Sequence, residues 1–144
     1  MTGGAMIATR SEVIACARGY LNSPYRHQGR IKAGVDCIGL AIAVCHDLGL
    51  GDFDFQAYSR EPDGVTLLRE IEKTCTHVQQ YQPGDLLVFR IRKLPQHTGI
   101  ATDLMNGPGL IHAYQSVGKV AEHTLTDWWK ERIVAAYRLP GVEP

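Results

Sequence analysis

Three residues of types that carry out nucleophilic catalysis occur in an order that could form one site. Cys37 stands at the start of a predicted helix, and His97 and His112 each fall in a predicted strand. The unpaired N–H groups and the dipole of a helix N-terminus favour a thiolate, and neighbouring antiparallel strands can place two histidines side by side. The pattern is typical of acyl transfer, in which a thiolate attacks, one imidazole moves the proton and a second polar group orients that imidazole.

The chemistry requires that the thiol be activated, because a free cysteine has a pKa of about 8.5 and is mostly protonated at neutral pH. We expect the helix dipole and a nearby His97 imidazolium to lower the pKa of Cys37. His112 would hydrogen-bond one ring nitrogen of His97 and leave the other aimed at the sulfur. A histidine in this third place adds no fixed negative charge, so its expected role is to set tautomer and orientation.

Local signals predict three helices in the first half of the chain. The first begins at Thr9, whose spacing to Glu12 is that of a capping box, and ends near Asn22 because Pro24 follows. After a loop, the second runs from Cys37 to Leu48, with Asp36 as its N-cap and Gly49 as its stop. The third is marked by apolar residues at helical spacing, with Asp63 as a possible cap; these are Val65, Leu68, Ile71 and Cys75.

The second half of the chain changes to the alternating pattern of strands. Strands are predicted within residues 82–91, 97–104, 107–116, 118–125 and 133–139, and a short helical turn is predicted in 126–132. Helices followed by an antiparallel sheet define an α+β fold with the helices packed on one face. We expect one domain over residues 1–144, of which 1–8 are flexible.

Composition narrows the function classes. The 15 basic and 15 acidic side chains give a formal net charge of zero, which argues against a nucleic-acid partner. The sequence has no secretory signal and no apolar run long enough for a membrane helix, so we expect synthesis in the cytoplasm and no membrane insertion. The four cysteines form no C-x-x-C pair, and we expect free thiols.

Several other residues are expected to be structural. Three cysteines fit core positions: Cys16, Cys45 and Cys75. His46 and His77 lie close in sequence to the last two, which is compatible with metal-binding pairs, but we expect both histidines at a helix surface or a helix end. His123 is expected to be exposed. The pair Trp128–Trp129 is expected to place one ring in the core and one at a protein interface, with a binding platform as the alternative.

The blocks that carry the candidate residues resemble those of NlpC/P60 cysteine peptidases. "DCIGL", "PGDLLVF", "HTGIA" and "IHA" are similar to that family's D-C-S-G-L, P-G-D-L-x-F-F, H-V-G-I-Y and I-H-A blocks, and "NSPYRHQGR" resembles its G-x-P-Y-R-Y-G-G block. Tyr25 lies 12 residues before Cys37, as in the family. The ordered set spans residues 10 to 138, whereas any one block is weak.

This resemblance implies a papain-like fold and hydrolysis of amide bonds in bacterial cell-wall peptides, most often the D-γ-glutamyl–diaminopimelate bond. Carried over to matching positions, Cys37 would be the nucleophile, His97 the general base and acid, and His112 the orienting residue. Tyr25 would support the oxyanion site. Asp36 matches a position that in some members holds the free amine of the stem peptide, and His27 would line the substrate groove.

The family implies no metal, although Cys37, His97 and His112 could ligate zinc in principle. Two departures bear on specificity: Ile38 replaces the usual serine after the nucleophile, and Gln28–Gly29 replaces a Gly-Gly pair.

The segments "PYRHQGR" and "GVDCIGL" most resemble the phage-encoded branch of the family. This resemblance implies a tail-tip or hub protein that opens the host cell wall when a phage or phage-derived particle injects its DNA. The rival interpretation is a structural tail protein that keeps the fold and uses the site little or not at all. Docking to the larger assembly would use the "YSREPDG" loop or the "LPGVEP" tail.

Overall fold

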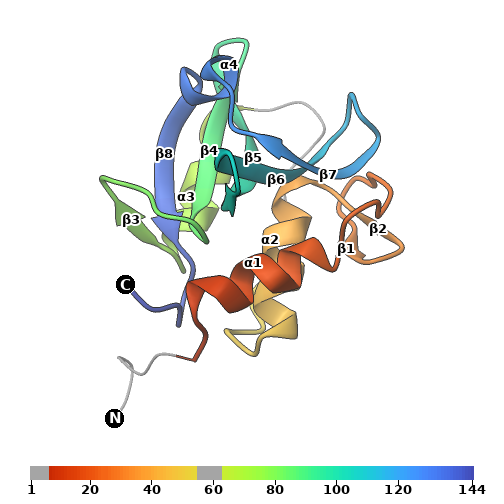
Figure 1. Ribbon diagram of the computed structural model, residues 1–144, viewed down its shortest axis with the longest axis vertical. Helices are drawn as coiled ribbons and strands as arrows, with labels where there is room; N and C mark the ends of the chain where they lie inside the picture. Colours follow the sequence, from red (N-terminus) through yellow and green to blue (C-terminus); the bar gives the residue numbers. More distant parts are fainter. Residues whose placement is uncertain (1–6, 55–62) are drawn as a thin grey trace.

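The computed structural model describes residues 7–54 and 63–144, and its helices precede most of its strands (Figure 1). Along the chain the elements are α1 (Arg10–Arg18), β1 (Arg30–Ile31), β2 (Gly34–Val35), α2 (Cys37–Asp47), α3 (Thr66–Glu72), β3 (Thr76–Val78), β4 (Leu86–Ile91), β5 (Leu94–Leu104), β6 (Gly107–Tyr114), β7 (Lys119–Thr124), α4 (Asp127–Lys130) and β8 (Ile133–Arg138). N-terminal helices and a C-terminal antiparallel sheet confirm the predicted α+β class.

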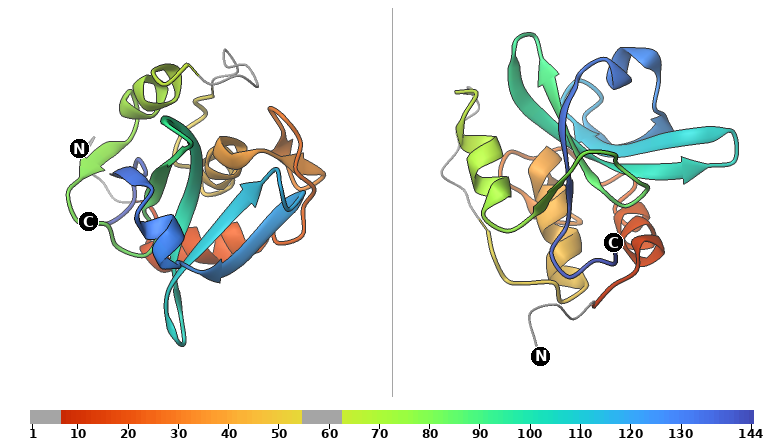
Figure 2. Two further views of the ribbon diagram at one scale, coloured as in Figure 1. Left: turned by 90° about the horizontal axis from the view of Figure 1, so that it is seen from above. Right: turned by 90° about the vertical axis from the view of Figure 1, so that its left-hand side faces the viewer.

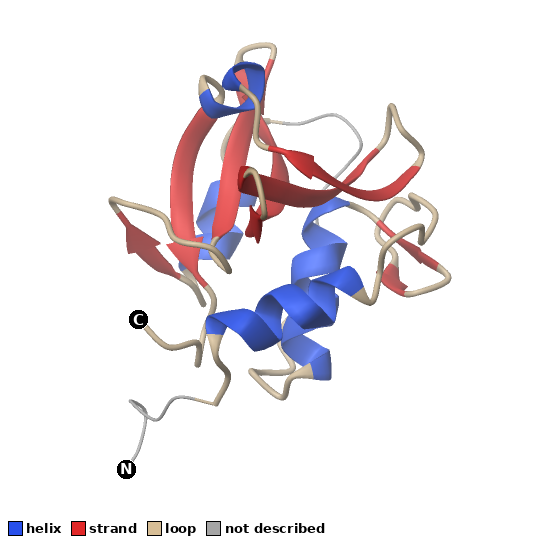
Figure 3. Ribbon diagram, viewed as in Figure 1, coloured by secondary structure: helices blue, strands red, loops and turns tan. Residues whose placement is uncertain are grey.

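The main sheet has the strand order β3-β8-β4-β5-β6-β7, and every neighbouring pair in it is antiparallel. Successive side chains of a strand point to opposite faces. Leu86 and Val88 accordingly join the core shared with α1 and α2, whereas Leu87 and Phe89 join a second cluster that includes Trp129 of α4. The sheet is therefore covered by the long helices on one face and by α4 on the other (Figures 2 and 3).

Helix α1 begins as predicted and ends earlier. Thr9 accepts a hydrogen bond from the Glu12 N–H, and the Glu12 carboxylate accepts one from the Thr9 N–H, which completes the capping box. The helix ends at Arg18, and Gly19 caps it. Three-residue turns continue from there to Asn22, whose φ of 72° breaks the helical path. The predicted end near Asn22 marks the last of these turns and not the helix terminus.

Helix α2 is the central element of the fold. Its N-cap is Asp36, and Leu48 and Gly49 end it as predicted, the latter with a φ of 70°. Every residue from Ile38 to Cys45 is buried. The helix is enclosed because α1, the β1–β2 hairpin, β5 and β6 all contact it.

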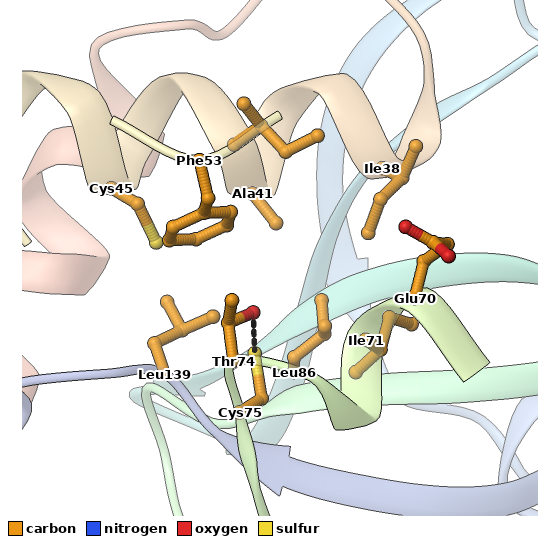
Figure 4. Close-up of a pocket in the computed structure, with 11 residues that line it drawn as sticks. Ile38, Ala41, Cys45, Phe53, Glu70, Ile71, Thr74, Cys75, Leu86 and Leu139 are labelled. Carbon is orange, nitrogen blue, oxygen red and sulfur yellow. Dashed lines mark hydrogen bonds between the residues drawn. The ribbon is translucent and has the colours of Figure 1, made fainter. Parts of the chain in front are cut away.

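The segment after α2 differs from the expectation in two ways. Helix α3 stops at Glu72, and Cys75 lies in the turn before β3, a strand that was not predicted. Asp63 does cap the start, since its carboxylate accepts hydrogen bonds from the Val65 and Thr66 N–H groups. An apolar hollow separates the α3–β3 segment from α2 and is lined by Ile38, Cys45 and Cys75 among others (Figure 4).

The first described residues lie beside the C-terminal segment. Residues 1–6 of the segment expected to be flexible lie outside the described residues, and the N–H groups of the next two, Ile7 and Ala8, bond to the Gly141 carbonyl. Within the predicted "LPGVEP" tail, Leu139 and Val142 are buried core residues. Of the "YSREPDG" loop, residues 58–62 lie outside the described residues. None of the described helices is long and apolar enough to cross a membrane.

Candidate active site

Cys37 is the first residue of α2 and is half-buried. The preceding Asp36 is 2% exposed and its Oδ1 accepts a hydrogen bond of 2.8 Å from the Gly39 N–H. Figure 1 shows this end of α2 next to the sheet and the β1–β2 hairpin. The N-cap thus holds the cysteine at the N-terminus of the helix, as the sequence predicts.

A loop before the helix is packed against its first turn. A side chain on Gly39 would place its Cβ 2.1 Å from the Gly29 carbonyl oxygen, so only glycine permits this approach. The Gln28 N–H donates to Asp36 Oδ2 at 2.7 Å, and the Arg30 guanidinium pairs with Asp36 Oδ1 at 3.3 Å and with Asp54 at 3.0 Å. Asp36 therefore joins the loop to the helix start. Whether it also binds a substrate amine stays a prediction.

The electrostatic setting of Cys37 differs from the sequence-based expectation. Burial, and then the Asp36 charge, raise the pKa of the Cys37 thiol to about 11, while the Thr98 N–H and hydroxyl lower it by less. The expected lowering of the pKa of Cys37 is therefore wrong, because desolvation and the Asp36 charge raise it. The proton therefore rests on sulfur, and attack by this thiol requires a base.

Three imidazole rings form a hydrogen-bonded chain across β5, β6 and β7. His97 Nε2 lies 2.7 Å from His112 Nδ1, and His112 Nε2 lies 2.8 Å from His123 Nε2. His123 Nδ1 ends the chain 2.8 Å from the Thr124 carbonyl oxygen. The structure thus brings His97 and His112 together as predicted and adds a third histidine.

Aromatic side chains surround this chain. The Trp129 ring lies with its centroid 5.5 Å from that of His97 and 5.0 Å from that of His112, and Phe89 and Tyr114 contact His97 at 5.9 and 5.0 Å. Burial, and then the neighbouring His112, lower the pKa of His97 well below 6.5. Burial and His123 lower the pKa of His112 to about 3. Both rings are therefore neutral at neutral pH, and a neutral imidazole can accept a proton.

Strand β5 (Leu94–Leu104) carries both His97 and a residue that influences Cys37. Thr98, which lowers the pKa of the Cys37 thiol, directly follows His97, and its side chain is fully buried. Among the described residues no hydrogen bond joins the Cys37 thiol to the His97 ring, whose Nε2 is bonded to His112. Contacts between nucleophile and base are often long before substrate binds and tighten in the Michaelis complex.

The two remaining predicted residues lie in the loop that precedes α2. Tyr25 is half-buried against the main core, and its backbone pairs with Val35, two residues before Cys37. The His27 Nδ1 lies 4.0 Å from Asp36 Oδ2. Both are thus near the helix start, and their roles toward an oxyanion and a substrate stay predictions.

The other cysteines and histidines lie apart from this site. All four cysteines are free thiols. His46 Nε2 lies 2.7 Å from the Phe53 carbonyl oxygen, and the exposed His77 packs edge-on against Tyr137. In residues 7–54 and 63–144 no group of three or more His, Cys, Asp or Glu side chains converges on a point that could hold a metal ion.

Sequence reasoning missed His123 and the enclosing role of Trp129. His123 was expected to be exposed, yet it is half-buried at the end of the imidazole chain. Strand alternation could have found it: His112 faces Ala121 across the β6–β7 pair, and His123 lies two residues further on the same face of the sheet.

Comparisons with known proteins identify the family of this chain and agree with its fold. The model of the NlpC/P60 family matches residues 22–138. Among solved structures, the NlpC/p60 domain of the peptidoglycan hydrolase SagA is 23% identical, with a TM-score of 0.61 over 92% of this chain and 100% of that one. An NlpC/P60 family protein from Bacillus cereus ATCC 10987 is 20% identical, with a TM-score of 0.67 over 93% of this chain but only 42% of that one.

A third structure similar to this chain is an N-acetylmuramoyl-L-alanine amidase from Bacteroides uniformis ATCC 8492. It is 13% identical, with a TM-score of 0.61 over 90% of this chain and 98% of that one. At such identities the structures establish the fold alone, and the family is established by the match to its model. No protein of curated function matches the sequence.

Proposed function

This chain belongs to the NlpC/P60 family, whose members are peptidoglycan hydrolases and generally cysteine peptidases, and from that premise we propose that it is a cysteine peptidase of peptidoglycan stem peptides. The observation that carries the proposal is the buried His97–His112 hydrogen bond of 2.7 Å. The residue after His97 is Thr98, which lowers the pKa of the Cys37 thiol. Because His112 occupies Nε2, only Nδ1 of His97 is left to serve the thiol.

The reaction follows from these assignments. His97 Nδ1 takes the Cys37 thiol proton as the sulfur attacks the substrate carbonyl carbon, and the same proton then passes to the departing amine as the C–N bond breaks. Water, deprotonated by His97, next attacks the thioester and releases the carboxylate and the thiol. The Cys37 N–H and the Tyr25 hydroxyl would donate to the oxyanion, and loss of one such donor typically costs about 2.7–4 kcal/mol.

The proposed scissile bond is the D-γ-glutamyl–diaminopimelate amide. Similar structures carry the names of a peptidoglycan hydrolase and of an N-acetylmuramoyl-L-alanine amidase, which are compatible with more than one wall amide. Ile38, where the family pattern has serine, is 4% exposed and lines the apolar hollow beside α2 (Figure 4). We infer that its replacement of serine acts on packing rather than on direct contact with the peptide.

The proposed setting is the tail tip or hub of a phage or phage-derived particle, with the protein made in the host cytoplasm and acting on the cell wall. The support is the likeness of "PYRHQGR" and "GVDCIGL" to phage-encoded sequences. The second candidate is a structural tail protein without turnover. The complete imidazole chain favours the enzyme, because a docking protein has no need of three hydrogen-bonded histidines on adjacent strands.

The decisive experiment is digestion of purified peptidoglycan, and of a synthetic stem tetrapeptide, with product masses read by mass spectrometry. The wild-type protein is expected to release the D-glutamyl fragment with a free γ-carboxylate. Cys37→Ala is expected to give no product, and Cys45→Ala, which changes a core thiol outside the site, is the matched control. Uncut substrate with the folded wild-type protein, together with normal particle assembly by Cys37→Ala, would overturn the enzyme assignment.

A further inference from the structure

His123 terminates the imidazole chain, and its position on β7 is set by the β6–β7 register. Leu110 faces His123 across this strand pair, while His112 faces Ala121. The His123 ring therefore lies diagonally beside that of His112, and the two ring centroids are 4.9 Å apart. The Trp129 ring lies 6.3 Å from His123 and covers the end of the chain. Glu122, the preceding residue, pairs with Arg18 of α1.

The direction of every proton in this chain follows from its last member. A carbonyl oxygen only accepts, so the His123 nitrogen that lies 2.8 Å from the Thr124 oxygen, Nδ1, carries a hydrogen. A neutral His123 then has a bare Nε2, which must accept from His112 Nε2–H at 2.8 Å. His112 in turn has a bare Nδ1, which must accept from His97 Nε2–H at 2.7 Å. The sequence of bonds leaves Nδ1 of His97 without a proton.

The reverse arrangement is disfavoured by the same carbonyl group. If His97 carried its proton on Nδ1, each donor along the chain would become an acceptor, and His123 Nδ1 would present a lone pair to the Thr124 oxygen. One hydrogen bond would be lost and two acceptors would face each other at 2.8 Å. A His97 protonated on Nδ1 cannot accept the thiol proton.

We propose that His123 is a positioning residue, which through the Thr124 carbonyl fixes the tautomer of His112 and of His97 and so keeps Nδ1 of His97 free to accept a proton. This inference rests on the proposed function of His97 as base, but the tautomer itself is a property of the resting protein. Burial supports it, because the lowered pKa values of His97 and His112 keep both rings neutral and therefore sensitive to tautomer.

Two substitutions separate this role from packing. In His123→Gln the amide oxygen can accept from His112 and the amide N–H can donate to the Thr124 carbonyl, so we expect kcat within about 3-fold of the wild type. His123→Leu can do neither, and we expect kcat to fall by about 10- to 100-fold, by analogy with the loss of a hydrogen-bond partner that orients a metal-ligating histidine. KM is expected to stay unchanged, since His123 lies at the end of the imidazole chain remote from His97.

The direct readout is two-bond ¹⁵N–¹H correlation NMR of protein labelled in the histidine rings. The wild type and His123→Gln are expected to carry the proton of His97 and of His112 on Nε2, and His123→Leu is expected to show Nδ1 protonation or a mixture. If His123→Leu fails to fold, His123→Asn replaces it, because its shorter amide can bond to the Thr124 carbonyl but falls short of His112.

Several outcomes would overturn the proposal: Nδ1 protonation of His97 in the wild type, wild-type tautomers in His123→Leu, or a glutamine variant as impaired as the leucine variant. The NMR experiment also works on the Cys37→Ala protein. Failure of the proposed function would leave the tautomers as expected with no peptide cleavage, so the two failures are distinguishable.

Discussion

The Cys37 side of the site is organised around a buried charge, whereas the His97 side is organised around neutral aromatic rings. On the first side, Asp36 accepts hydrogen bonds from two backbone N–H groups and pairs with Arg30. On the second, His97 and His112 contact each other and the rings of Tyr114 and Trp129. Both arrangements immobilise a reactive group, but they respond to different perturbations.

The difference follows from where each group sits in the fold. A helix start offers unpaired N–H groups, which a carboxylate satisfies and which give it a reason to be buried. The middle of a sheet offers no such donors, because its backbone groups are paired with neighbouring strands. A buried imidazole there is kept neutral, and its hydrogen bonds must come from other side chains.

The largest predicted effect is the loss of turnover when the His97 side is changed. His97→Gln retains a polar side chain of similar size but removes the proton acceptor, so we expect kcat for stem-peptide cleavage to fall by about 10²- to 10⁴-fold. His77→Gln is the control, because this exposed histidine of β3 lies outside the site. Steady-state kinetics with both variants measures the effect, and near wild-type turnover by His97→Gln would remove His97 from the mechanism.

Much of this site was predictable because its signals are local or periodic. Asp36, Cys37 and Gly49 mark the limits of α2 by cap and stop preferences that depend on neighbours in sequence. Strand alternation likewise predicted the pairing of His97 with His112, which lie on adjacent strands.

What the sequence did not predict depends on tertiary packing. The β1–β2 hairpin consists of paired two-residue strands, and it follows a close approach of Gly29 to Gly39 of α2 that no propensity reveals. The pKa of Cys37 is raised because the surrounding chain excludes water, which is a property of the assembled fold. The burial of His123 follows from its place in the β6–β7 register, and the expectation that it is exposed was therefore wrong.

The Cys37 side is tested by removing the Asp36 carboxylate. Asp36→Ala deletes the helix cap, the bond from Gln28 and the partner of Arg30, so we expect the free energy of unfolding to fall by about 3 kcal/mol, the lower end for breaking a buried ion pair, since Arg30 keeps Asp54. Asp36→Asn retains a capping oxygen and should lose less. Urea denaturation of both proteins measures the difference, and equal losses would show that the charge, not the cap, dominates.

The His97 side is also expected to lose stability at low pH. Folded His112 has a pKa of about 3, against 6.5 for an exposed histidine, so below pH 6.5 the unfolded chain binds more protons. Stability is complete above pH 6.5 and falls as the pH drops toward 3, by about 2–3 kcal/mol at pH 4.5 from this ring alone. His97 adds to the loss, because its pKa is lowered in the same direction.

The measurement is the free energy of unfolding in urea at pH 7.5, 6.0 and 4.5. His112→Gln is the matched variant: it lowers stability at every pH, but it should remove its own share of the decline between pH 6.5 and 4.5. The carboxylates contribute equally to both proteins and cancel in the comparison. A variant whose stability declined as steeply as that of the wild type would contradict a neutral, buried His112.

The smallest predicted effect concerns the loop of Gln28 and Gly29, which packs on the Cys37 side. Gln28 has a φ of 62°, a left-handed conformation that costs a residue with a Cβ roughly 1–2 kcal/mol. Gln28→Gly removes this cost and retains the backbone N–H that donates to Asp36. Glycine loses more chain entropy on folding, by roughly 0.5–1 kcal/mol, so the expected net gain in unfolding free energy lies between about 0 and 1.5 kcal/mol.

The converse substitution provides the control for this gain. Gly118 has a φ of 86°, and a Cβ at this position would meet no heavy atom within 4 Å, so Gly118→Ala changes backbone conformation alone. We expect it to lower the free energy of unfolding by about 1 kcal/mol. If Gly118→Ala destabilises as expected and Gln28→Gly does too, the Gln28 side chain stabilises the loop by more than its backbone strain costs, and the charged side of the site extends one residue further than Asp36 and Arg30.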